Sequence, residues 1–438
     1  MKWITYNLLF AFAYTLLLPR FLLRMWRRGG YRRGFLERFA CYTPAQRAAL
    51  AARRRVWIHA VSVGEMFVGL AFLRELRARN PGLGFVLTTT TSTGHALARA
   101  RLAPEDVLLY VPVDFPWVVR RAVRRIRPLA LLLVEGEVWP NLVRRLHREG
   151  VPVALVNGRL SARSFAGFAR IRPFVRDIYA RLALFAAQGR ADADRYLALG
   201  APADRVAVLG SAKYDIARAD AESARPPRDV LERAGFPPDA LLILGGSTWP
   251  GEERILLDLF RKLRSEFPAA RLVLVPRHAE RAAEVEADLR DTGLTWVRRR
   301  ALEPGRPSAR AEVLLVDTTG ELKGFYAAAT VVFVGKSLTQ HGGQNIMEPA
   351  ALGKPVIVGP NMENFLPVME DFLRANAVIQ VASADELGRR LAELLRDPAA
   401  RECFADRARR LVRDQSGVIA ATADRLLRDI PALAQPSA

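Results

Sequence analysis

The chain has 438 residues, which is enough for two domains of ordinary size and allows three. Hydrophobic residues make up 50% and charged residues 25%, so a large core is possible and a disordered chain is excluded. The formal net charge is +21, and residues 1–60 contribute +11 of it, from 12 Lys and Arg residues against the single acid Glu37. This basic excess indicates an anionic partner, such as nucleic acid, anionic lipid or a phosphorylated substrate.

An apolar run opens the chain and a basic run follows it. Trp3 to Leu18 is almost wholly apolar, and the cations behind it are Arg20, Arg24, Arg27, Arg28, Arg32 and Arg33. We predict a helical membrane anchor over residues 1–28, whose basic flank stays cytoplasmic and suits an anionic membrane surface. A helix that spans the bilayer and one that lies in it both remain open, because the run is short for a full span. A cleaved signal peptide is disfavoured, since no small-residue cleavage site follows.

After Tyr42, short apolar runs alternate with amphipathic stretches. This alternation predicts a parallel, doubly wound sheet. The expected strands are Val56–Val63, Gly84–Thr90, Val107–Pro112, Leu129–Glu135, Val151–Asn157, Leu182–Ala187 and Val206–Gly210, with helices near Met66–Arg79, from Gly94, over Pro116–Ile126 and over Pro140–Glu149.

A polar stretch at mid-chain then interrupts the pattern. Asp220–Asp229 contains Pro226 and Pro227, and it predicts a linker over residues 220–230 between domains at 29–219 and 231–438. The alternation restarts behind it, so we expect a second Rossmann-like domain, with room for the last helix to pack back on the first. The expected strands are Ala240–Gly245, Arg271–Val275, Val313–Val316, Val331–Gly335 and Pro355–Val358, with helices from Glu252, Ala279, Glu321, Asn345 and Asp385, over Ala400–Leu411 and after Gly417.

Charged side chains at predicted strand ends are candidates for chemistry, because ligands bind there in open α/β sheets. Glu65 follows the first strand and opens a helix, where a general base or merely favourable helix-start electrostatics would both explain it. Glu135 and Glu137 follow an apolar strand, and two carboxylates there are costly without partners. Lys213 follows the last strand before the linker, where it is either a solvated lysine or a counter-charge for a phosphate or carboxylate.

Turns rich in Gly and hydroxyl residues also join strands to helices. Thr88–Gly94 and Gly245–Thr248, with Ser247 and Thr248, suit either anion binding or ordinary N-capping. In the second half, Arg277 lies at a strand end. The densest motif is Gly335–Pro349, a Gly-rich loop with Gly342 and Gly343 in which Asn345 and Glu348 share a helical face. Such a loop is able to admit phosphate, and the carboxylate is able to accept bonds from ribose hydroxyls.

As an ordered set, these motifs resemble the Kdo (3-deoxy-D-manno-octulosonic acid) transferases, which are inverting glycosyltransferases. The resemblance covers most of the chain and rests on V-S-V-G-E, E-G-E-V-W-P-N, N-G-R-L-S, G-S-A-K-Y-D, V-P-R-H, T-T-G-E-L and H-G-G-Q-N-I-M-E-P-A. It implies the GT-B architecture, in which two Rossmann-like doubly wound domains face an interdomain cleft, here with an N-terminal membrane-anchoring helix. The sequence departs from the family pattern at Gly136, Gly158, Gln344 and Ile346.

The resemblance also implies roles for particular residues. Glu65 would deprotonate the acceptor hydroxyl, while Glu135 and Lys213 would stabilise the transition state. The nucleotide would bind at Pro276, Arg277, Gly320, Glu321, Leu322, Asn345, Ile346, Met347 and Glu348. The family's donor is CMP-Kdo, and its acceptor is a phosphorylated, acylated glucosamine disaccharide, the lipid A precursor of lipopolysaccharide. The resemblance therefore implies a place on the cytoplasmic side of the bacterial inner membrane.

Metals and cofactors are not expected. The five histidines show no metal-ligand spacing, Cys41 and Cys403 lie in no motif, and Asp192 and Asp194 belong to helical sequence rather than to a metal-binding D-x-D. Two other functions remain as alternatives, a transferase that uses a UDP-sugar and a basic membrane-bound nucleic-acid-binding protein. Nucleic-acid binding is disfavoured, because the charge gathers beside the apolar run instead of along a face with interleaved aromatics.

Overall fold

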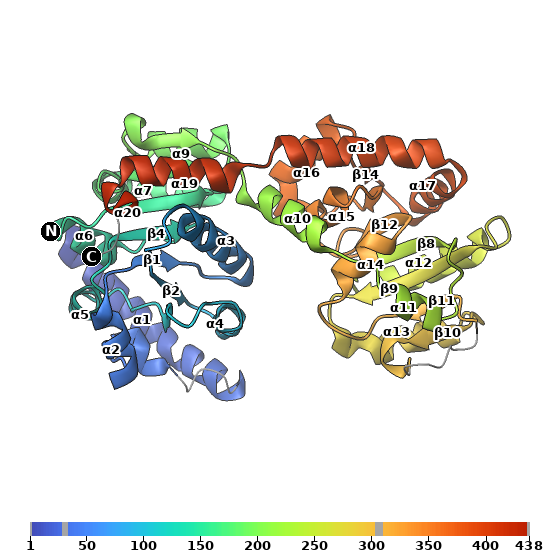
Figure 1. Ribbon diagram of the computed structural model, residues 1–438, viewed down its shortest axis with the longest axis horizontal. Helices are drawn as coiled ribbons and strands as arrows, with labels where there is room; N and C mark the ends of the chain where they lie inside the picture. The colour runs from blue at the N-terminus through green and yellow to red at the C-terminus, as the bar shows by residue number, and fades with distance from the viewer. Residues whose placement is uncertain (1, 29–33, 303–309, 436–438) are drawn as a thin grey trace. The chain divides into compact units, whose positions relative to one another are not determined.

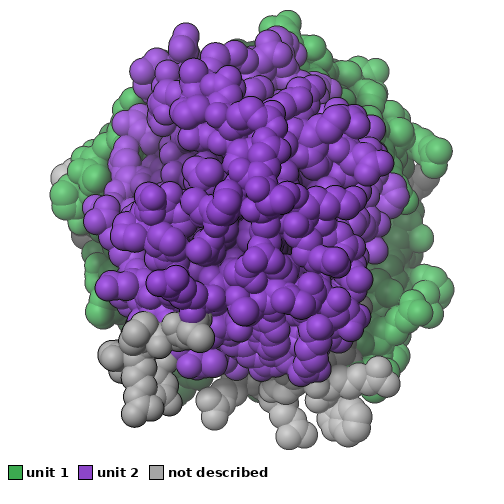
Figure 2. All heavy atoms as spheres, turned by 90° about the vertical axis from the view of Figure 1, so that its right-hand side faces the viewer, with its two compact units in different colours: residues 1–212, 417–438 green, residues 213–416 purple. Residues whose placement is uncertain are grey.

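The computed structural model describes residues 2–28, 34–302 and 310–435. The chain folds into two compact units (Figures 1 and 2). Unit 1 is Met1–Ala212 with Gly417–Ala438, and unit 2 is Lys213–Ser416. Each unit is built around one parallel sheet of seven strands, with helices packed on its faces. The predicted fold class of two Rossmann-like, doubly wound α/β domains is therefore confirmed.

The sheet of unit 1 has the order β3-β2-β1-β4-β5-β6-β7. Its central strands are buried on both faces, which is why their sequences are continuous apolar runs instead of alternating ones. The strands are β1 (Val56–His59), β2 (Phe85–Thr89), β3 (Val107–Tyr110), β4 (Ala130–Val134), β5 (Val153–Gly158), β6 (Leu184–Ala187) and β7 (Val206–Val208).

Helices of unit 1 begin where the sequence supplies caps. A capping box of Thr43 and Gln46 starts one helix, and Ser62 and Ser161 accept from backbone N–H groups at the start of two others. The helices are α1 (Lys2–Arg28), η1 (Phe35–Phe39), α2 (Pro44–Ala52), α3 (Val63–Arg79), α4 (Ser92–Arg99), α5 (Pro116–Ile126), α6 (Pro140–Arg148), α7 (Ala162–Arg170), α8 (Arg172–Tyr179), α9 (Arg190–Ala198), η2 (Ala203–Arg205), α19 (Val418–Asp429) and α20 (Pro431–Ala434).

The N-terminal helix α1 is longer than the apolar run and continues through Pro19. One side of it packs on unit 1, where Tyr6 donates a 2.8 Å hydrogen bond to the carboxylate of Asp114. In the described part of the chain, no helix combines the length and the apolar character needed to cross a bilayer. Arg32 and Arg33 of the predicted basic flank lie outside the described residues.

The sheet of unit 2 has the order β10-β11-β9-β8-β12-β13-β14. Its strands are β8 (Leu241–Thr248), β9 (Ala270–Pro276), β10 (Trp296–Arg298), β11 (Val313–Leu315), β12 (Val331–Val334), β13 (Val356–Val358) and β14 (Ile379–Gln380). Its helices are α10 (Ala212–Ser223), α11 (Arg228–Arg233), α12 (Glu252–Leu263), η3 (Ala279–Arg281), α13 (Ala282–Arg290), η4 (Arg299–Ala301), α14 (Leu322–Ala328), α15 (Met347–Ala351), η5 (Glu363–Phe365), α16 (Leu366–Arg374), α17 (Ala384–Arg396) and α18 (Pro398–Asp414).

The division of the chain differs from the predicted linker at residues 220–230. Helices α10 and α11 occupy most of that stretch, and unit 2 begins at Lys213. The stretch looks polar because α10 buries only one side, with Tyr214 and Ala217 in the core of unit 2, while Asp220 pairs with Lys323 at 2.6 Å. The chain returns to unit 1 at Gly417, whose φ of 96° only glycine adopts readily. Helix α19 then packs against α3, where Asp424 pairs with Arg79 at 3.1 Å.

Candidate active site

Each unit has a topological switch point, where consecutive crossovers leave the sheet in opposite directions. It lies between β1 and β4 in unit 1 and between β8 and β12 in unit 2. Ligands of doubly wound sheets bind beyond the carboxyl ends of the strands at this point. Glu65 and Glu135 follow β1 and β4, and Ser247 and Thr248 end β8, so these candidate residues lie at the switch points, whereas Arg277 follows the neighbouring strand β9.

In unit 1, the switch point forms a pocket of about 240 Å³. Three predicted carboxylates, those of Glu65, Glu135 and Glu137, line it together. The other lining residues are Gly136, Arg159, Ser161 and Ser164. The structure thus brings together side chains from three strand ends that the sequence separates by up to 99 residues (Ser164 minus Glu65).

Glu65 lies in the first turn of α3, where hydrogen bonds orient its carboxylate. Its carboxylate accepts a 2.9 Å hydrogen bond from the N–H of Val61 and a 3.0 Å bond from the hydroxyl of Ser62. Burial raises the pKa of Glu65 above its ordinary value, the charges of Glu135 and Glu137 raise it further, and the two hydrogen bonds lower it. The carboxylate is therefore oriented, and its pKa is shifted toward neutral pH, as a general base requires. Glu65 therefore has the favourable helix-start position that the sequence predicts, and its carboxylate also lines the pocket.

Glu135 has a strained backbone. Its φ is +65°, which is uncommon for a residue with a side chain, and Asn157 at the end of the neighbouring strand β5 has a φ of +52°. The amide of Asn157 donates to the Glu135 carboxylate at 3.3 Å, and its oxygen accepts from the N–H of Ala212 at 3.0 Å. Strain of this kind persists at sites where it positions a side chain for function.

Some residues around this pocket were not predicted from the sequence. Arg159, Ser161 and Ser164 line it at the start of α7, where Ser161 is the N-cap. Behind it, the side chain of His59 is 1% exposed and its Nε2 lies 3.6 Å from Glu137. The position of His59 at a strand end was the available signal, since that is the criterion by which Glu135 was found.

The threonine-rich turn between β2 and α4 has a structural role. The hydroxyls of Thr89 and Thr91 both donate to the carbonyl of Val61, at 3.2 and 3.1 Å, and Thr91 caps α4 by accepting from Gly94. These bonds fix the segment that precedes Glu65. N-capping, one of the two interpretations of this turn, is therefore present at Thr91.

Lys213 is the second residue of α10 and the first residue of unit 2. Its side chain is half-buried and already interacts with its surroundings. Neighbouring Tyr214 is buried, so the start of this helix is fixed by the core of unit 2.

In unit 2, Glu252 organises the loops at the switch point. Its side chain is fully buried, and its carboxylate accepts four backbone hydrogen bonds of 2.8–3.0 Å, from Trp249, Lys336, Ser337 and Leu338. Trp249 belongs to the loop after β8, and the other three donors belong to the loop after β12. One buried carboxylate therefore joins the two loops that flank the sheet end.

Asn345 and Glu348 are in contact, but not on one helical face as predicted, because α15 begins at Met347 and Asn345 lies in the loop before it. The amide of Asn345 donates to Glu348 at 3.0 Å, and its oxygen accepts from the N–H of Met347 at 3.0 Å. Burial raises the pKa of Glu348, while Lys323, Asn345 and Arg277 lower it. Ile346 and Met347 are buried core residues, so they position the pair and offer no exposed side chain of their own.

The remaining predicted residues of unit 2 lie on neighbouring loops. Arg277 follows Pro276 at the end of β9, and its N–H donates to the carbonyl of Thr248 at 3.0 Å. Gly320 and Glu321 precede α14, which begins at Leu322, and Glu321 pairs with Arg299 at 2.9 Å. Gly342 and Gly343 both have positive φ, and a side chain at Gly342 would meet Asn364 at 2.5 Å, which accounts for glycine there.

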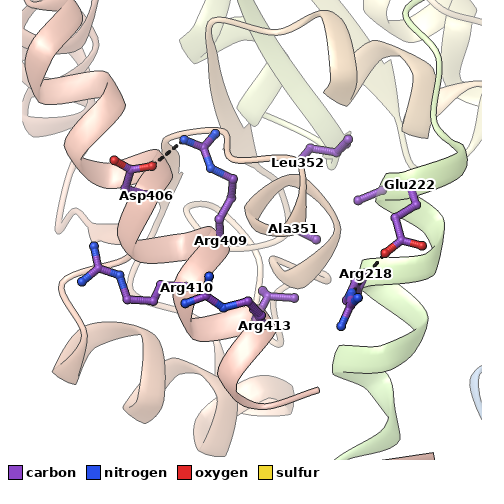
Figure 3. Close-up of a pocket in the computed structure, with 10 residues that line it drawn as sticks. Arg218, Glu222, Ala351, Leu352, Asp406, Arg409, Arg410 and Arg413 are labelled. Atoms are coloured by element: carbon purple, nitrogen blue, oxygen red, sulfur yellow. Dashed lines mark hydrogen bonds and ion pairs between the residues drawn. The ribbon is translucent and has the colours of Figure 1, made fainter. Parts of the chain in front are cut away.

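A larger hollow of about 760 Å³ lies between α10, α15 and α18 of unit 2 (Figure 3). Arginines dominate its lining, but most are paired with acids. Arg218 lies 3.1 Å from Glu222, Arg409 lies 2.6 Å from Asp406, and Arg413 lies 3.3 Å from Asp414. The hollow contains none of the predicted site residues, and we assign it no part in the site.

Across residues 2–28, 34–302 and 310–435, no group of three or more His, Cys, Asp and Glu side chains is arranged to hold a metal ion. Asp192, part of the rejected D-x-D pattern, lies in α9 and accepts a 2.8 Å hydrogen bond from the N–H of Leu160. Its role is to hold the loop before α7.

Comparison with known proteins agrees with the geometry. Residues 33–216 match the family model of the 3-deoxy-D-manno-octulosonic-acid transferases, and residues 255–411 match the model of group 1 glycosyl transferases. The chain is 36% identical to a 3-deoxy-D-manno-octulosonic acid transferase of Bordetella pertussis, over 94% of this chain and 98% of that one. It is 32% identical to the enzyme of that name from Haemophilus influenzae, over 89% of this chain and 90% of that one.

A solved UDP-GlcNAc 2-epimerase from Neisseria meningitidis shares the fold at a TM-score of 0.58 and 13% identity, over 86% of this chain and 99% of that chain. The fold is thus GT-B-like, with two parallel-sheet α/β domains. Because the match to the two transferases spans nearly their whole length, the chain belongs to the 3-deoxy-D-manno-octulosonic acid transferase family of glycosyltransferases.

Proposed function

We propose that the protein transfers Kdo from CMP-Kdo to a phosphorylated, acylated glucosamine disaccharide, the lipid A precursor, with inversion and without a metal ion. The observation that carries this proposal is the pocket in unit 1, where Glu65 is oriented by two hydrogen bonds and its pKa is raised by burial. A sugar hydroxyl is a weak nucleophile, and a positioned carboxylate is the group that removes its proton.

In the proposed reaction, Glu65 takes the proton of the acceptor hydroxyl as the oxygen attacks the anomeric carbon of the donor. The bond between that carbon and the phosphate oxygen of CMP breaks, and the phosphate leaves with the electron pair. Glu135 lines the same pocket, and its carboxylate is suited to stabilise the positive charge that develops on the sugar ring. Lys213 is suited to offset the negative charge of the leaving phosphate or of the sugar carboxylate.

We assign donor binding to the sheet end of unit 2. The carboxylate of Glu348, fixed by Asn345, is suited to accept hydrogen bonds from the ribose hydroxyls. Arg277 supplies a positive charge for the phosphate of the nucleotide, and the N–H groups at Gly320–Leu322 are further donors. The buried carboxylate of Glu252 holds the loop after β8 to the loop after β12.

We further propose that α1 attaches the enzyme to the cytoplasmic face of the inner membrane by lying in the bilayer surface. One side of α1 is aromatic and packs on unit 1, with Phe10 against Phe115 at 5.2 Å and Trp3 against Phe174 at 5.3 Å between ring centroids. The other side is exposed and apolar, with Ile4, Leu8, Leu9, Phe12, Leu16 and Leu17 each more than half exposed. A helix with one docked face and one bare apolar face is suited to the headgroup boundary.

A basic surface next to α1 supports the same attachment. Phe115, which packs on α1, stacks on Trp117, and Trp117 is 60% exposed. Arg120, Arg121, Arg124 and Arg125 of α5 line a hollow with it. Tryptophan favours the membrane–water interface, and each arginine near an anionic surface contributes about 1 kcal/mol. This surface would bring the pocket of Glu65 to the membrane that contains the acceptor.

The proposal is tested by offering the full-length enzyme a panel of donors with lipid A precursor in detergent or vesicles, and by mass spectrometry of the product. We expect a product with CMP-Kdo, none with UDP-sugars, and no loss of rate with EDTA. Transfer from a UDP-sugar, inhibition by EDTA that added metal reverses, or no product with CMP-Kdo would each overturn it. Salt-sensitive DNA binding by the protein would instead favour the nucleic-acid alternative.

A further inference from the structure

His59, the last residue of β1, is buried behind the carboxylate pocket. Its Nδ1 lies 3.2 Å from the carbonyl oxygen of Thr88 and 3.1 Å from the hydroxyl oxygen of Thr88. That hydroxyl accepts a 2.9 Å hydrogen bond from the indole N–H of Trp57, and it donates to the carbonyl of Ile58 at 3.5 Å. The Thr88 carbonyl therefore faces Nδ1 of His59 as an acceptor.

This arrangement favours one tautomer of His59. A carbonyl oxygen only accepts hydrogen bonds, so the carbonyl of Thr88, at 3.2 Å, favours a hydrogen on Nδ1. In a neutral imidazole the other nitrogen, Nε2, then has a lone pair and no hydrogen. Nε2 is a donor only when the ring carries a second proton.

The atom that faces Nε2 is also an acceptor. Oε2 of Glu137 lies 3.6 Å away, and both atoms are buried without another hydrogen-bond partner in the described structure. Two facing lone pairs in a buried position repel, whereas one proton between them makes an attractive pair. The contact is therefore stable when the two side chains together hold that proton.

We propose that His59 is a positioning residue that shares one proton with Glu137 and so removes one negative charge from the pocket in which Glu65 acts. The inference rests on the proposed role of Glu65 as base. Three carboxylates and one cation, Arg159, face this pocket: Glu65 from α3, Glu135 from the end of β4, Glu137 from the loop before α6, and Arg159 from the loop after β5. The proton held by His59 and Glu137 lowers the negative potential at Glu65, so that Glu65 loses its own proton at a lower pH.

The test is the pH profile of kcat for full-length enzyme variants with CMP-Kdo and lipid A precursor. His59→Phe keeps an aromatic ring at this position but leaves Glu137 as an unpaired carboxylate, which raises the pKa of Glu65. The acid limb of the profile should move to higher pH by on the order of 0.5–1.5 units, the size expected for one added charge in the same pocket. In the double variant His59→Phe/Glu137→Gln the limb should return to its wild-type position, a rescue that a merely structural role of His59 would not produce.

A second measurement avoids dependence on the folding of the His59 variants. Glu137→Gln removes the carboxylate together with the shared proton, so the charge of the pocket and the acid limb should stay unchanged. If Glu137 of the wild-type enzyme were instead charged and unpaired, its removal would move the acid limb to lower pH. Movement to lower pH, or a soluble, folded His59→Phe variant with an unshifted limb, would overturn the inference. Glu65→Gln is measured alongside, and full activity in that variant would refute the proposed base. An inactive Glu65→Gln together with an unshifted acid limb in His59→Phe would refute only the role of His59.

Discussion

The amide of Asn157 donates a hydrogen bond to the carboxylate of Glu135 at 3.3 Å, and both residues have left-handed backbone conformations at the ends of adjacent strands. Unit 2 repeats the pattern with Ser247 and Lys336, whose φ values are +53° and +58° at the ends of β8 and β12. In both units the strained residues lie at a sheet end next to the candidate site. Backbone strain of this kind is often retained where it positions a side chain for function.

The strain at Glu135 predicts an unusual ranking of two variants. Glu135→Gly should have a free energy of unfolding about 1 kcal/mol higher than Glu135→Ala, because glycine adopts a φ of +65° without steric cost. Both variants should lose most of their transfer activity, since both lack the carboxylate. Chemical denaturation and product assays measure the two quantities. Equal stability of the two variants would show that the backbone at this position is unstrained.

The raised pKa of Glu65 predicts opposite trends for activity and stability. Activity should fall as the pH drops through the pKa of Glu65, above its ordinary 4.5, because the base must be unprotonated. A carboxyl with a raised folded-state pKa contributes stability below its unfolded pKa, and that contribution is lost as the pH rises through the folded value. Glu65→Gln does not titrate, so its stability relative to wild type should increase between about pH 4.5 and neutral pH. Thermal unfolding at several pH values measures this, and a constant difference between the two proteins would contradict it.

Glu252 should be essential for the stability of unit 2. Glu252→Gln keeps one acceptor oxygen but turns an NH₂ group toward backbone donors, so about 3 kcal/mol of unfolding free energy should be lost. CMP-Kdo affinity should fall as well, because the loops after β8 and β12 lose their link. The matched control is Glu266→Gln, whose carboxylate is exposed and pairs with Arg396, and whose effect should stay below about 0.5 kcal/mol. Denaturation and titration calorimetry measure both effects, and equal losses in the two variants would refute the role of Glu252.

The exposed apolar side of α1 predicts that substitutions on this side weaken binding to membranes. Phe12→Asp and Leu16→Asp, at positions 71% and 66% exposed, should each reduce binding to anionic phospholipid vesicles at least tenfold while leaving thermal stability unchanged. The control is Leu373→Asp in unit 2, an exposed leucine remote from α1 in the sequence. Flotation with vesicles at two salt concentrations measures the binding. Undiminished flotation of both α1 variants would rule out this face as the membrane contact.

The fold could be predicted as far as apolar runs mark it. All strands of unit 1 were predicted in their order, since each is an apolar run, including the short and partly exposed β7. In unit 2, β10 (Trp296–Arg298) and β14 (Ile379–Gln380) were missed because they are short and carry polar residues. The end of helix α10 was predicted to belong to a linker, because the outer side of this helix is polar. Only its inner side, with Tyr214 and Ala217, belongs to the core.

The candidate site residues that directly follow a strand in the sequence could be predicted. Glu65, Glu135 and Glu137 were found because each acid follows an apolar run. Arg159 and Asn157 were missed because the residues near them come from neighbouring strands, and no local pattern gives the order of the strands. His59 ends an apolar run as well, but its contact with Glu137 depends on the same strand order. Glu252 was missed as an organiser for the same reason, since three of its four donors lie more than 80 residues away.

Single-turnover product formation with CMP-Kdo and lipid A precursor shows whether Glu65 removes the proton of the acceptor hydroxyl. Glu65→Gln should slow transfer by about 10²–10⁴-fold with the protein folded and CMP-Kdo still bound. Glu75→Gln, on the same helix α3, where Glu75 pairs with Arg79, is the matched control and should react at nearly the wild-type rate. A Glu65→Gln enzyme that forms product within tenfold of the wild-type rate would contradict the account.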